Sequence, residues 1–240
     1  MKIIKPSYEI RTDIPGNGIW VLKDLEEDAR ICYKSEDRIT EDGESSRKLI
    51  KRLIDSGHEA MLEGFDIKVR FICDRGISHE LVRHRLCSFS QESTRYCNYA
   101  QGKFGSEITV IEPVIFEEIS QERKDSIFED FESGDDLIVT DTEKAYILWR
   151  DVCNHLESAY MDLVNRRKVP PEIARSVLPT CLKTEINMTT NLREWRHILE
   201  LRTSERAHPE MRRLMIPLLC ELHGRIPVVF DDIYDKVVVK

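Results

Sequence analysis

The sequence predicts an α+β protein in which a mixed sheet packs against long helices. Apolar and polar residues alternate over 65–74 and 182–188, as in half-buried strands, whereas apolar residues recur at helical spacing over 45–56 and 140–168. These segments do not follow a regular strand–helix–strand order, which argues against a doubly wound parallel sheet. A chain of 240 residues can bury a sizeable core without disulfides or metals, so we expect a single domain over residues 1–240.

The first half of the chain predicts a helix, a strand and a second helix. The first helix covers about 45–56, and Gly57 occupies the position of a C′ glycine. The strand at 65–74 comes next. Helical spacing returns over 77–86, and the small polar residues of 87–94 are typical of a loop.

The longest predicted helix begins at a capping box. Thr140 and Glu143 have the spacing of that motif, and the helix should end near Lys168. Its expected apolar positions are Leu148, Trp149, Val152, Leu156, Tyr160, Leu163 and Val164.

Proline and asparagine residues mark the elements of the last third. A short helix within 170–179 is bounded by prolines, and the strand at 182–188 follows it. Asn191 should cap the next helix. Pro209 suits the first turn of a final long helix, which Pro217 should kink.

The charge is unevenly distributed. The formal net charge is −8, but residues 117–136 contain nine carboxylates and two basic residues, a local net charge of −7. Such a chain lacks the broad basic surface that binds nucleic acid through many phosphates. This acidic stretch could be a solvated surface helix or a contact for a neighbouring subunit.

The apolar runs argue against a membrane or secreted protein, and the cysteine spacing argues against a zinc-binding protein. No apolar run approaches the ~20 residues of a membrane span, and the start of the chain has no apolar core of a secretory signal, so we expect a cytoplasmic protein without a membrane partner. Seven cysteines without any C-x-x-C pair indicate reduced structural thiols and no metal site.

Polar groups are densest between Arg83 and Tyr96. On a helix, Arg83 and Arg85 would point to different faces and so to two polar targets. Ser93 and Arg95, two residues apart in a loop, can direct a hydroxyl, backbone N–H groups and a guanidinium at one phosphate. The alternative is a solvated basic helix end.

Two more arginines stand among apolar residues. Arg175 and Arg202 are therefore candidates for partial burial, which is costly unless an anion pairs with them. The anion could be a ligand. It could equally be one of four nearby carboxylates: Glu172, Glu200, Glu205 or Glu210.

The residues of the first cluster reproduce a complete signature. Arg83-His84-Arg85, Ser88, Ser93, Arg95 and Tyr96 have the spacing RHR-x-x-S-x-x-x-x-S-x-R-Y, which resembles the signature of the flavin-dependent thymidylate synthases. Further segments are similar to landmarks of that family, in its order: Asp28-Ala29-Arg30, Gly57-His58-Glu59, Glu63, Glu172-Ile173-Ala174-Arg175, Leu178-Pro179, Asn191-Leu192-Arg193 and Leu201-Arg202. The acidic stretch at about 117–136 matches least and resembles an insertion.

This resemblance implies a fold and a reaction. The fold would be the thymidylate synthase-complementing (ThyX-like) fold. The reaction would convert dUMP to dTMP with FAD as cofactor, and with NADPH and 5,10-methylenetetrahydrofolate as co-substrates. The resemblance also implies a homotetramer whose active sites draw on several subunits.

The resemblance further implies a set of site residues. Arg202 would activate the uracil of dUMP. The flavin would contact His58, Ala60, Arg83, His84, Arg85, Gln91, Asn191, Leu192, Arg193 and His197. The dUMP ligands would be Glu80, Arg83, Gln91, Glu92, Ser93, Thr94, Arg95, Arg175 and Arg202.

Several residues complicate this assignment. Glu92 places a carboxylate next to Ser93, which is unfavourable beside a phosphate unless the side chain turns away. Arg206 is one more cation, which could bind a ligand or pair with Glu210. A thiolate nucleophile at Cys87 or Cys97 is conceivable, but both fill variable positions of the signature.

Three alternatives remain open at this stage. A member of the same family could methylate another uridylate such as UMP, because nothing in the sequence specifies the sugar. A nucleic-acid-binding module would use the arginine cluster for phosphates, against the acidic charge of the remainder. A protein that keeps the fold but lacks catalysis would not bind FAD.

Overall fold

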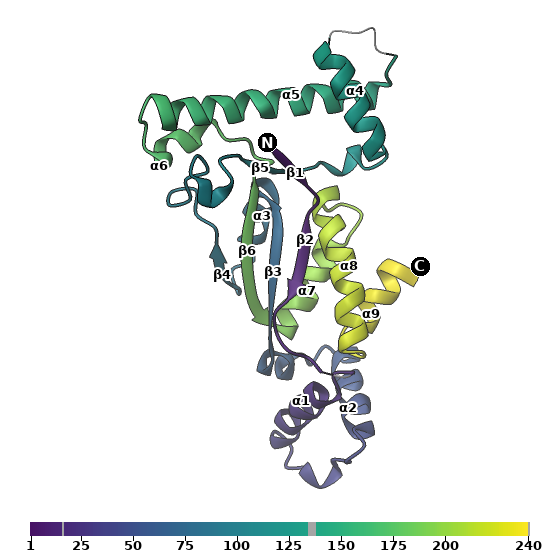
Figure 1. Ribbon diagram of the computed structural model, residues 1–240. Coiled ribbons are helices and arrows are strands. Elements are labelled where there is room, and N and C mark those ends of the chain that lie inside the picture. The colour runs from purple at the N-terminus through teal and green to yellow at the C-terminus, as the bar shows by residue number, and fades with distance from the viewer. Residues whose placement is uncertain (16, 134–137, 240) are drawn as a thin grey trace. The chain divides into compact units, whose positions relative to one another are not determined.

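A computed structural model describes residues 1–15, 17–133 and 138–239 of the chain (Figure 1). Its larger sheet has the strand order β2-β3-β6-β4, formed by Ser7–Ile10, Asp66–Asp74, Lys183–Asn191 and Ser88–Gln91. The smaller sheet pairs β1 (Lys2–Ile4) in parallel with β5 (Thr109–Ile111). The α-helices are α1 (Ile19–Ile31), α2 (Glu44–Asp55), α3 (Arg75–Leu81), α4 (Gln121–Ser133), α5 (Asp141–Met161), α6 (Pro171–Ala174), α7 (Leu192–Arg202), α8 (Pro209–Arg225) and α9 (Asp231–Tyr234).

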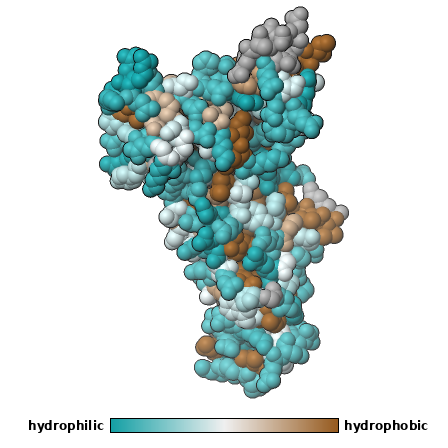
Figure 2. Space-filling model, viewed as in Figure 1, coloured by the Kyte–Doolittle hydropathy of each residue, from teal (hydrophilic) through white to brown (hydrophobic). Residues whose placement is uncertain are grey.

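The chain divides into two compact units. Unit 1 comprises residues 1–6, 72–79 and 91–185, and unit 2 comprises residues 7–71, 80–90 and 186–240. The prediction of one domain over residues 1–240 stays a prediction. Among the described residues, no helix is long and apolar enough to span a membrane. On the face shown in Figure 2 hydrophilic residues predominate, and hydrophobic ones are scattered among them.

Unit 2 builds its core around helix α7. Trp195 is completely buried, its ring lies 6.5 Å from that of Phe71, and its indole N–H donates to the Ile67 carbonyl of β3 at 3.0 Å. Hydrogen bonding of a buried indole prevents the cost of an unpaired donor. Helix α7 is thereby attached to the sheet along the strand that precedes the signature segment.

Helices α1 and α2 of unit 2 are joined through one buried carboxylate. Glu26 of α1 has no exposed surface, and it accepts hydrogen bonds from Arg30 on its own helix and from the hydroxyls of Ser45 and Ser46 at the start of α2. A buried charge of this kind is tolerated because every lone pair meets a donor.

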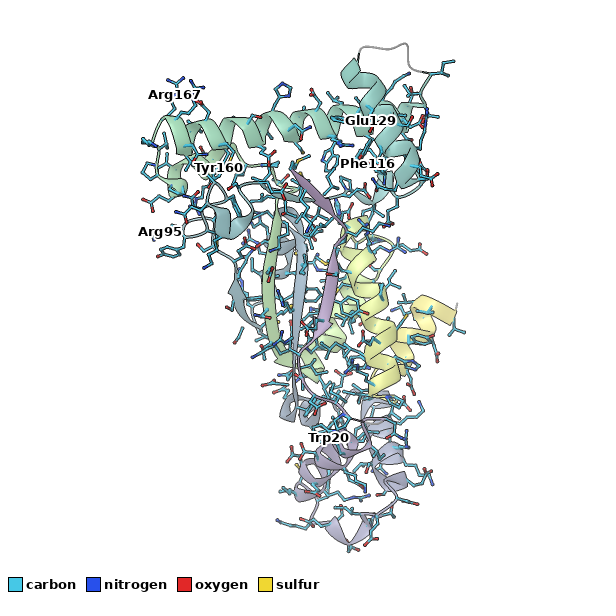
Figure 3. All side chains as sticks on the ribbon, viewed as in Figure 1. Trp20, Arg95, Phe116, Glu129, Tyr160 and Arg167 are labelled. Atoms are coloured by element: carbon cyan, nitrogen blue, oxygen red, sulfur yellow. The ribbon has the colours of Figure 1, made fainter. Side chains whose placement is uncertain are left out.

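Unit 1 packs its long helix α5 over the loops that follow β4 and β5. Tyr160 and Tyr146 of α5 are buried, and the Tyr160 ring lies 6.1 Å from that of Tyr99 (Figure 3 labels Tyr160). The capping box is present in full, since Thr140 Oγ1 accepts from the Glu143 amide and Glu143 accepts from the Thr140 amide.

Most predicted elements are confirmed to within a few residues. They include the helix at 45–56, both alternating strands, the helix that Asn191 caps and the helix that Pro209 begins. Gly57 has φ of +71°, a left-handed conformation that favours glycine at a helix end. Helix α5 ends at Met161 and continues as a π-helical turn over 162–166, close to the predicted end. The kink at Pro217 stays a prediction.

Two predicted boundaries near the signature are wrong. The helix expected over 77–86 ends at Leu81, and Val82 and Leu86 are exposed. The loop expected over 87–94 contains strand β4, because Ser88–Gln91 pairs with β6. Local spacing favoured a longer helix, but pairing with a distant strand determined the conformation.

The hydrophobic face of α5 also differs from the expected one. Leu148 and Val152 are exposed, whereas Tyr146, Ile147 and Cys153 are buried. Tyr160 is buried as predicted, and the remaining expected positions are half-buried: Trp149, Leu156, Leu163 and Val164. The prediction is therefore wrong at Leu148 and Val152, because only the packing partners decide which side of a largely apolar helix is covered.

The acidic stretch contains helix α4 within unit 1. The interpretation of the stretch as a solvated surface helix holds for only one side of α4. On the other side Ile127 has no exposed surface, and Lys124 forms a buried ion pair with Glu112 at 2.8 Å. Residues 134–136 of the stretch lie outside the described part of the chain.

Candidate active site

The Arg83-His84-Arg85 segment lies in a turn of unit 2, directly after α3. Arg83 and Arg85 are exposed and His84 is buried. The hydroxyl of Thr190 in β6 donates to the Leu86 carbonyl at 3.1 Å, which attaches this turn to the sheet. The prediction that Arg83 and Arg85 point in two directions assumed that both lie on a helix. Helix α3 ends at Leu81, so that assumption is wrong.

Arg202 forms the centre of a polar cluster in unit 2. At the end of α7, its Nε donates to His84 Nε2 at 3.0 Å and its terminal nitrogens donate to the carboxylate and the carbonyl of Glu80 at 2.7 and 3.3 Å. The side chain is 17% exposed, so the predicted partial burial is confirmed. Its ion-pair partner is Glu80, which was predicted as a dUMP ligand, and none of the four carboxylates named from the sequence.

His84 is kept neutral by its surroundings. Burial, together with the nearby charges of Arg202 and His197, lowers its pKa from 6.5 to about 4. A neutral imidazole has one nitrogen that can accept a hydrogen bond, and here Nε2 accepts from Arg202.

This neutral state predicts a pH effect on stability. Because the pKa of His84 falls from 6.5 in the unfolded chain to about 4 in the folded one, its contribution is fully present above pH 6.5 and is lost as the pH falls toward 4. The difference amounts to at most about 3 kcal/mol. We expect the melting temperature to fall more steeply between pH 7 and 4.5 for the wild type than for His84→Gln, which does not titrate. Parallel curves for the two proteins would contradict this.

Other predicted flavin contacts line two cavities of unit 2. One cavity of about 730 Å³ contains Asn191, Arg193 and His197 in its wall, and another of about 830 Å³ contains His58 and Ala60. Arg193 pairs with the exposed Glu63 at 2.6 Å. The carboxylate can be exchanged for a ligand at little cost because the pair is solvated.

Asn191 and Leu192 stabilise the start of helix α7. The Asn191 side chain accepts from the Glu194 amide at 3.0 Å and so caps α7. Leu192 is completely buried, and its amide donates to the Phe65 carbonyl. Their flavin contacts stay predictions.

Three groups of unit 2 are close enough to suggest a metal site. Potential ligand atoms of His84, Glu194 and His197 all lie within 4.8 Å of one another. However, the lone pair of His84 Nε2 already accepts from Arg202, whose permanent positive charge would repel a metal cation. The cluster is better suited to hydrogen bonding than to metal ligation.

Ser93 and Arg95, which were predicted to direct a hydroxyl and a guanidinium at one phosphate, lie in the loop after β4 in unit 1. Gln91 Nε2 donates to Ser78 Oγ and Thr184 Oγ1 at 2.8 and 3.2 Å, which holds the start of the loop. Thr94 is buried and accepts from Arg175 at 3.0 Å. Thus Thr94 and Arg175 are in contact, and the roles of Gln91, Thr94 and Arg175 as dUMP ligands stay predictions.

Arg95 and Arg175 project from this loop region toward solvent. Arg95 Nε donates to Glu172 of α6 at 3.1 Å, and Figure 3 shows its side chain beside that helix. Ser93 Oγ accepts from the Arg95 amide at 3.3 Å. Arg175 is exposed, so the prediction of its partial burial is wrong: Ile173, which made the run look apolar, is itself 60% exposed.

The Glu92 carboxylate is held by two donors, Tyr99 and Lys183. It accepts from the Tyr99 hydroxyl at 2.8 Å and from Lys183 Nζ at 3.0 Å. Burial and the neighbouring carboxylate raise the pKa of Tyr99, which therefore stays a donor. Neither Tyr99 nor Lys183 was recognised from the sequence, since both lie outside the signature. The prediction of Glu92 as a dUMP ligand stays a prediction, but the carboxylate already has two donors.

Loss of one donor should release Glu92. In Tyr99→Phe the carboxylate keeps only Lys183, so it can approach Ser93 and repel a phosphate. We expect the KM for dUMP to rise about fivefold to tenfold with little change in kcat, since one hydrogen bond is worth about 1 kcal/mol. Tyr234→Phe, whose ring stacks on His223 in unit 2, serves as control. An unchanged KM for Tyr99→Phe would show that Glu92 does not affect the phosphate.

The cysteines agree with the expected thiols. All seven are free, and burial raises the pKa of Cys87 to about 11. A thiol with a raised pKa is a poor nucleophile at neutral pH. Cys87 is therefore unsuited to attack a pyrimidine.

Comparisons with known proteins agree with the signature. Residues 22–228 match the family model described as thymidylate synthase complementing protein. The flavin-dependent thymidylate synthases of Corynebacterium aurimucosum and Mycobacterium marinum are 31% and 30% identical to this chain over 210 and 207 residues. Each alignment covers 85% of this chain, and 77% and 76% of the respective relative. The chain belongs to the flavin-dependent thymidylate synthase family.

A solved structure supports the fold class. The crystal structure of thymidylate synthase X from Helicobacter pylori with FAD and dUMP has a TM-score of 0.68 and 23% sequence identity, and the alignment covers 95% of this chain and 98% of that one. The predicted α+β fold of the ThyX type is thereby confirmed.

Proposed function

We propose that this protein is a flavin-dependent thymidylate synthase that converts dUMP to dTMP, with 5,10-methylenetetrahydrofolate as carbon donor and NADPH as reductant. One observation carries the proposal: Arg202 donates hydrogen bonds to both His84 and Glu80, although more than a hundred residues separate it from either. Each of the three residues was predicted as a ligand of dUMP or flavin. Family membership and the complete signature support it.

The residues of unit 2 fit a flavin. The two cavities present Arg193, His197 and His58, which can hydrogen-bond to phosphates and to a polar ring system. Arg83 and Arg85 are exposed cations beside this region's buried His84. When bound, FAD would supply the redox chemistry of the reaction.

Arg202 would act on the uracil of dUMP. Its guanidinium is permanently charged and held by three acceptors, so it needs no reorganisation when negative charge develops on the pyrimidine. Glu80 can form hydrogen bonds to the nucleotide from the same position. In unit 1, Ser93, Thr94, Arg95 and Arg175 would bind the dianionic phosphate through hydroxyls and cations.

Absorbance spectroscopy tests this function directly. Purified protein reconstituted with FAD should lose its flavin absorbance when NADPH is added without oxygen. The absorbance should return when methylenetetrahydrofolate and dUMP are added together, with formation of dTMP. A flavin that remains reduced under these conditions, or a protein that does not bind FAD, would contradict the proposal.

Tritium release distinguishes the alternative substrate. We expect release from 5-labelled dUMP and not from 5-labelled UMP; the opposite preference would identify a methylase of another uridylate. The proposal includes a cytoplasmic homotetramer whose active sites draw on several subunits. Light scattering of the purified protein measures that subunit number.

A further inference from the structure

A row of four polar side chains runs through unit 2 and includes one carboxylate that no prediction assigned to the site. Glu194 Oε1 lies 3.7 Å from His84 Nδ1, His84 Nε2 accepts from Arg202 Nε at 3.0 Å, and Arg202 donates to Glu80 at 2.7 Å. The side chains of Glu194 and His84 are 10% and 5% exposed. The row therefore begins at a buried carboxylate, and its third member, Arg202, is the group proposed to activate uracil.

The hydrogen bond from Arg202 shows which tautomer of His84 is present. The guanidinium Nε always carries a proton and has no lone pair to offer, so His84 Nε2 must be the acceptor. The ring proton of the neutral imidazole then resides on Nδ1, the nitrogen that faces Glu194. In the other tautomer two N–H groups would oppose each other, and Arg202 would lose one of its three acceptors.

The charge of Glu194 favours this tautomer. At 3.7 Å the contact is longer than a direct hydrogen bond, so the carboxylate acts through its field on the Nδ1–H dipole. Both groups are shielded from solvent, and screening between them is weak. The other groups that face the ring are Arg202, which has no lone pair to offer, and His197, whose ring centre lies 6.2 Å away. Of these groups, Glu194 is the one that carries a negative charge.

We propose that Glu194 is a positioning residue, whose carboxylate holds His84 in the Nδ1-protonated tautomer and thereby fixes the orientation of the Arg202 guanidinium. The part that concerns catalysis rests on the proposed function, since it requires Arg202 to act on dUMP. The part that concerns the tautomer is independent of any activity. A capping role of Glu194 in the first turn of α7 would stabilise the helix but would not set the tautomer.

Nitrogen NMR of ¹⁵N-histidine-labelled protein tests the tautomer. The His84 signals, assigned by their loss in His84→Gln, should show a proton on Nδ1 and none on Nε2 in the wild type. In Glu194→Gln the population should shift toward the Nε2-protonated form. Glu221→Gln, which alters a carboxylate that pairs with Arg225 on α8, should leave the His84 signals unchanged. A wild-type proton on Nε2, or identical signals in wild type and Glu194→Gln, would overturn the proposal.

Kinetics test the consequence for Arg202. We expect kcat for dUMP to fall about tenfold in Glu194→Gln with little change in KM, because a small misorientation of a catalytic group is costly. Glu194→Asp keeps the charge and should retain the wild-type tautomer and most of kcat. A fall in kcat without a tautomer shift would overturn the positioning role. If the wild type itself lacks synthase activity, the proposed function fails, and the NMR result still decides what Glu194 does to His84.

Discussion

Replacement of Arg202 by alanine should lower the turnover of dUMP by two to three orders of magnitude while the protein keeps its flavin. Loss of one preorganised donor to developing negative charge typically has an effect of about 10²–10³ on kcat. Arg202 is held by His84 and Glu80 from two sides, so its charge is in place before substrate arrives. Tritium release from 5-labelled dUMP at saturating substrate measures the effect.

One further variant separates charge from geometry at this position, and a second, at a distant arginine, serves as control. Arg202→Lys keeps a cation but cannot donate to His84 and Glu80 from a planar fork, so it should recover only part of the activity. Arg225→Ala on α8 removes a guanidinium that pairs with Glu221 outside the cluster, and it should leave turnover unchanged. Arg202→Ala that binds FAD and turns over dUMP at the wild-type rate would refute the assignment.

Replacement of Glu26 by alanine should cause the largest loss of stability. The carboxylate is fully buried and accepts from two nitrogens of Arg30 and from the hydroxyls of Ser45 and Ser46, at 2.7 to 2.9 Å. Its removal leaves the Arg30 charge buried and unpaired, which typically costs about 3–5 kcal/mol. The midpoint of unfolding in guanidinium chloride measures the loss.

Matched variants identify the cause of that loss. Glu44→Ala on α2 removes an exposed pair with Lys48 and should change the midpoint little. The double variant Glu26→Met with Arg30→Met removes both charges and fills the volume, so it should recover part of the stability. A loss for Glu26→Ala no larger than that for Glu44→Ala would contradict the argument. Arg30 belongs to the Asp28-Ala29-Arg30 landmark. Its role there is structural, because it pairs with the buried Glu26.

Elements with strong local patterns could be predicted from the sequence. The alternation at 65–74 and the cap at Asn191 depend on neighbours in the chain, so residue spacing sufficed to locate β3 and the start of α7. Helix α1 and the short strands β1, β2 and β5 were not predicted. Strands of three or four residues show too few alternations to be recognised, and pairing with other strands stabilises them.

The candidate site could be predicted only as a set of residues. The signature spacing identified Arg83, His84 and Arg95, and the landmark Leu201-Arg202 pointed to Arg202. No local pattern indicated that Glu80 would be the partner of Arg202, because the two are 122 residues apart. Glu194 was missed as well, since its position in the first turn of a helix is common for an acidic residue.

The sequence by itself determined the fold class, the family and the chemical types of the groups that we propose to bind the ligands. Only the tertiary structure decided that the helix before the signature ends at Leu81, that Glu92 turns to Tyr99 and Lys183, and that Arg202 meets His84. The physical reason is the range of the interactions. Helix caps and strand alternation are local, whereas hydrogen bonds between buried polar groups join residues that the chain brings together only when its core has packed.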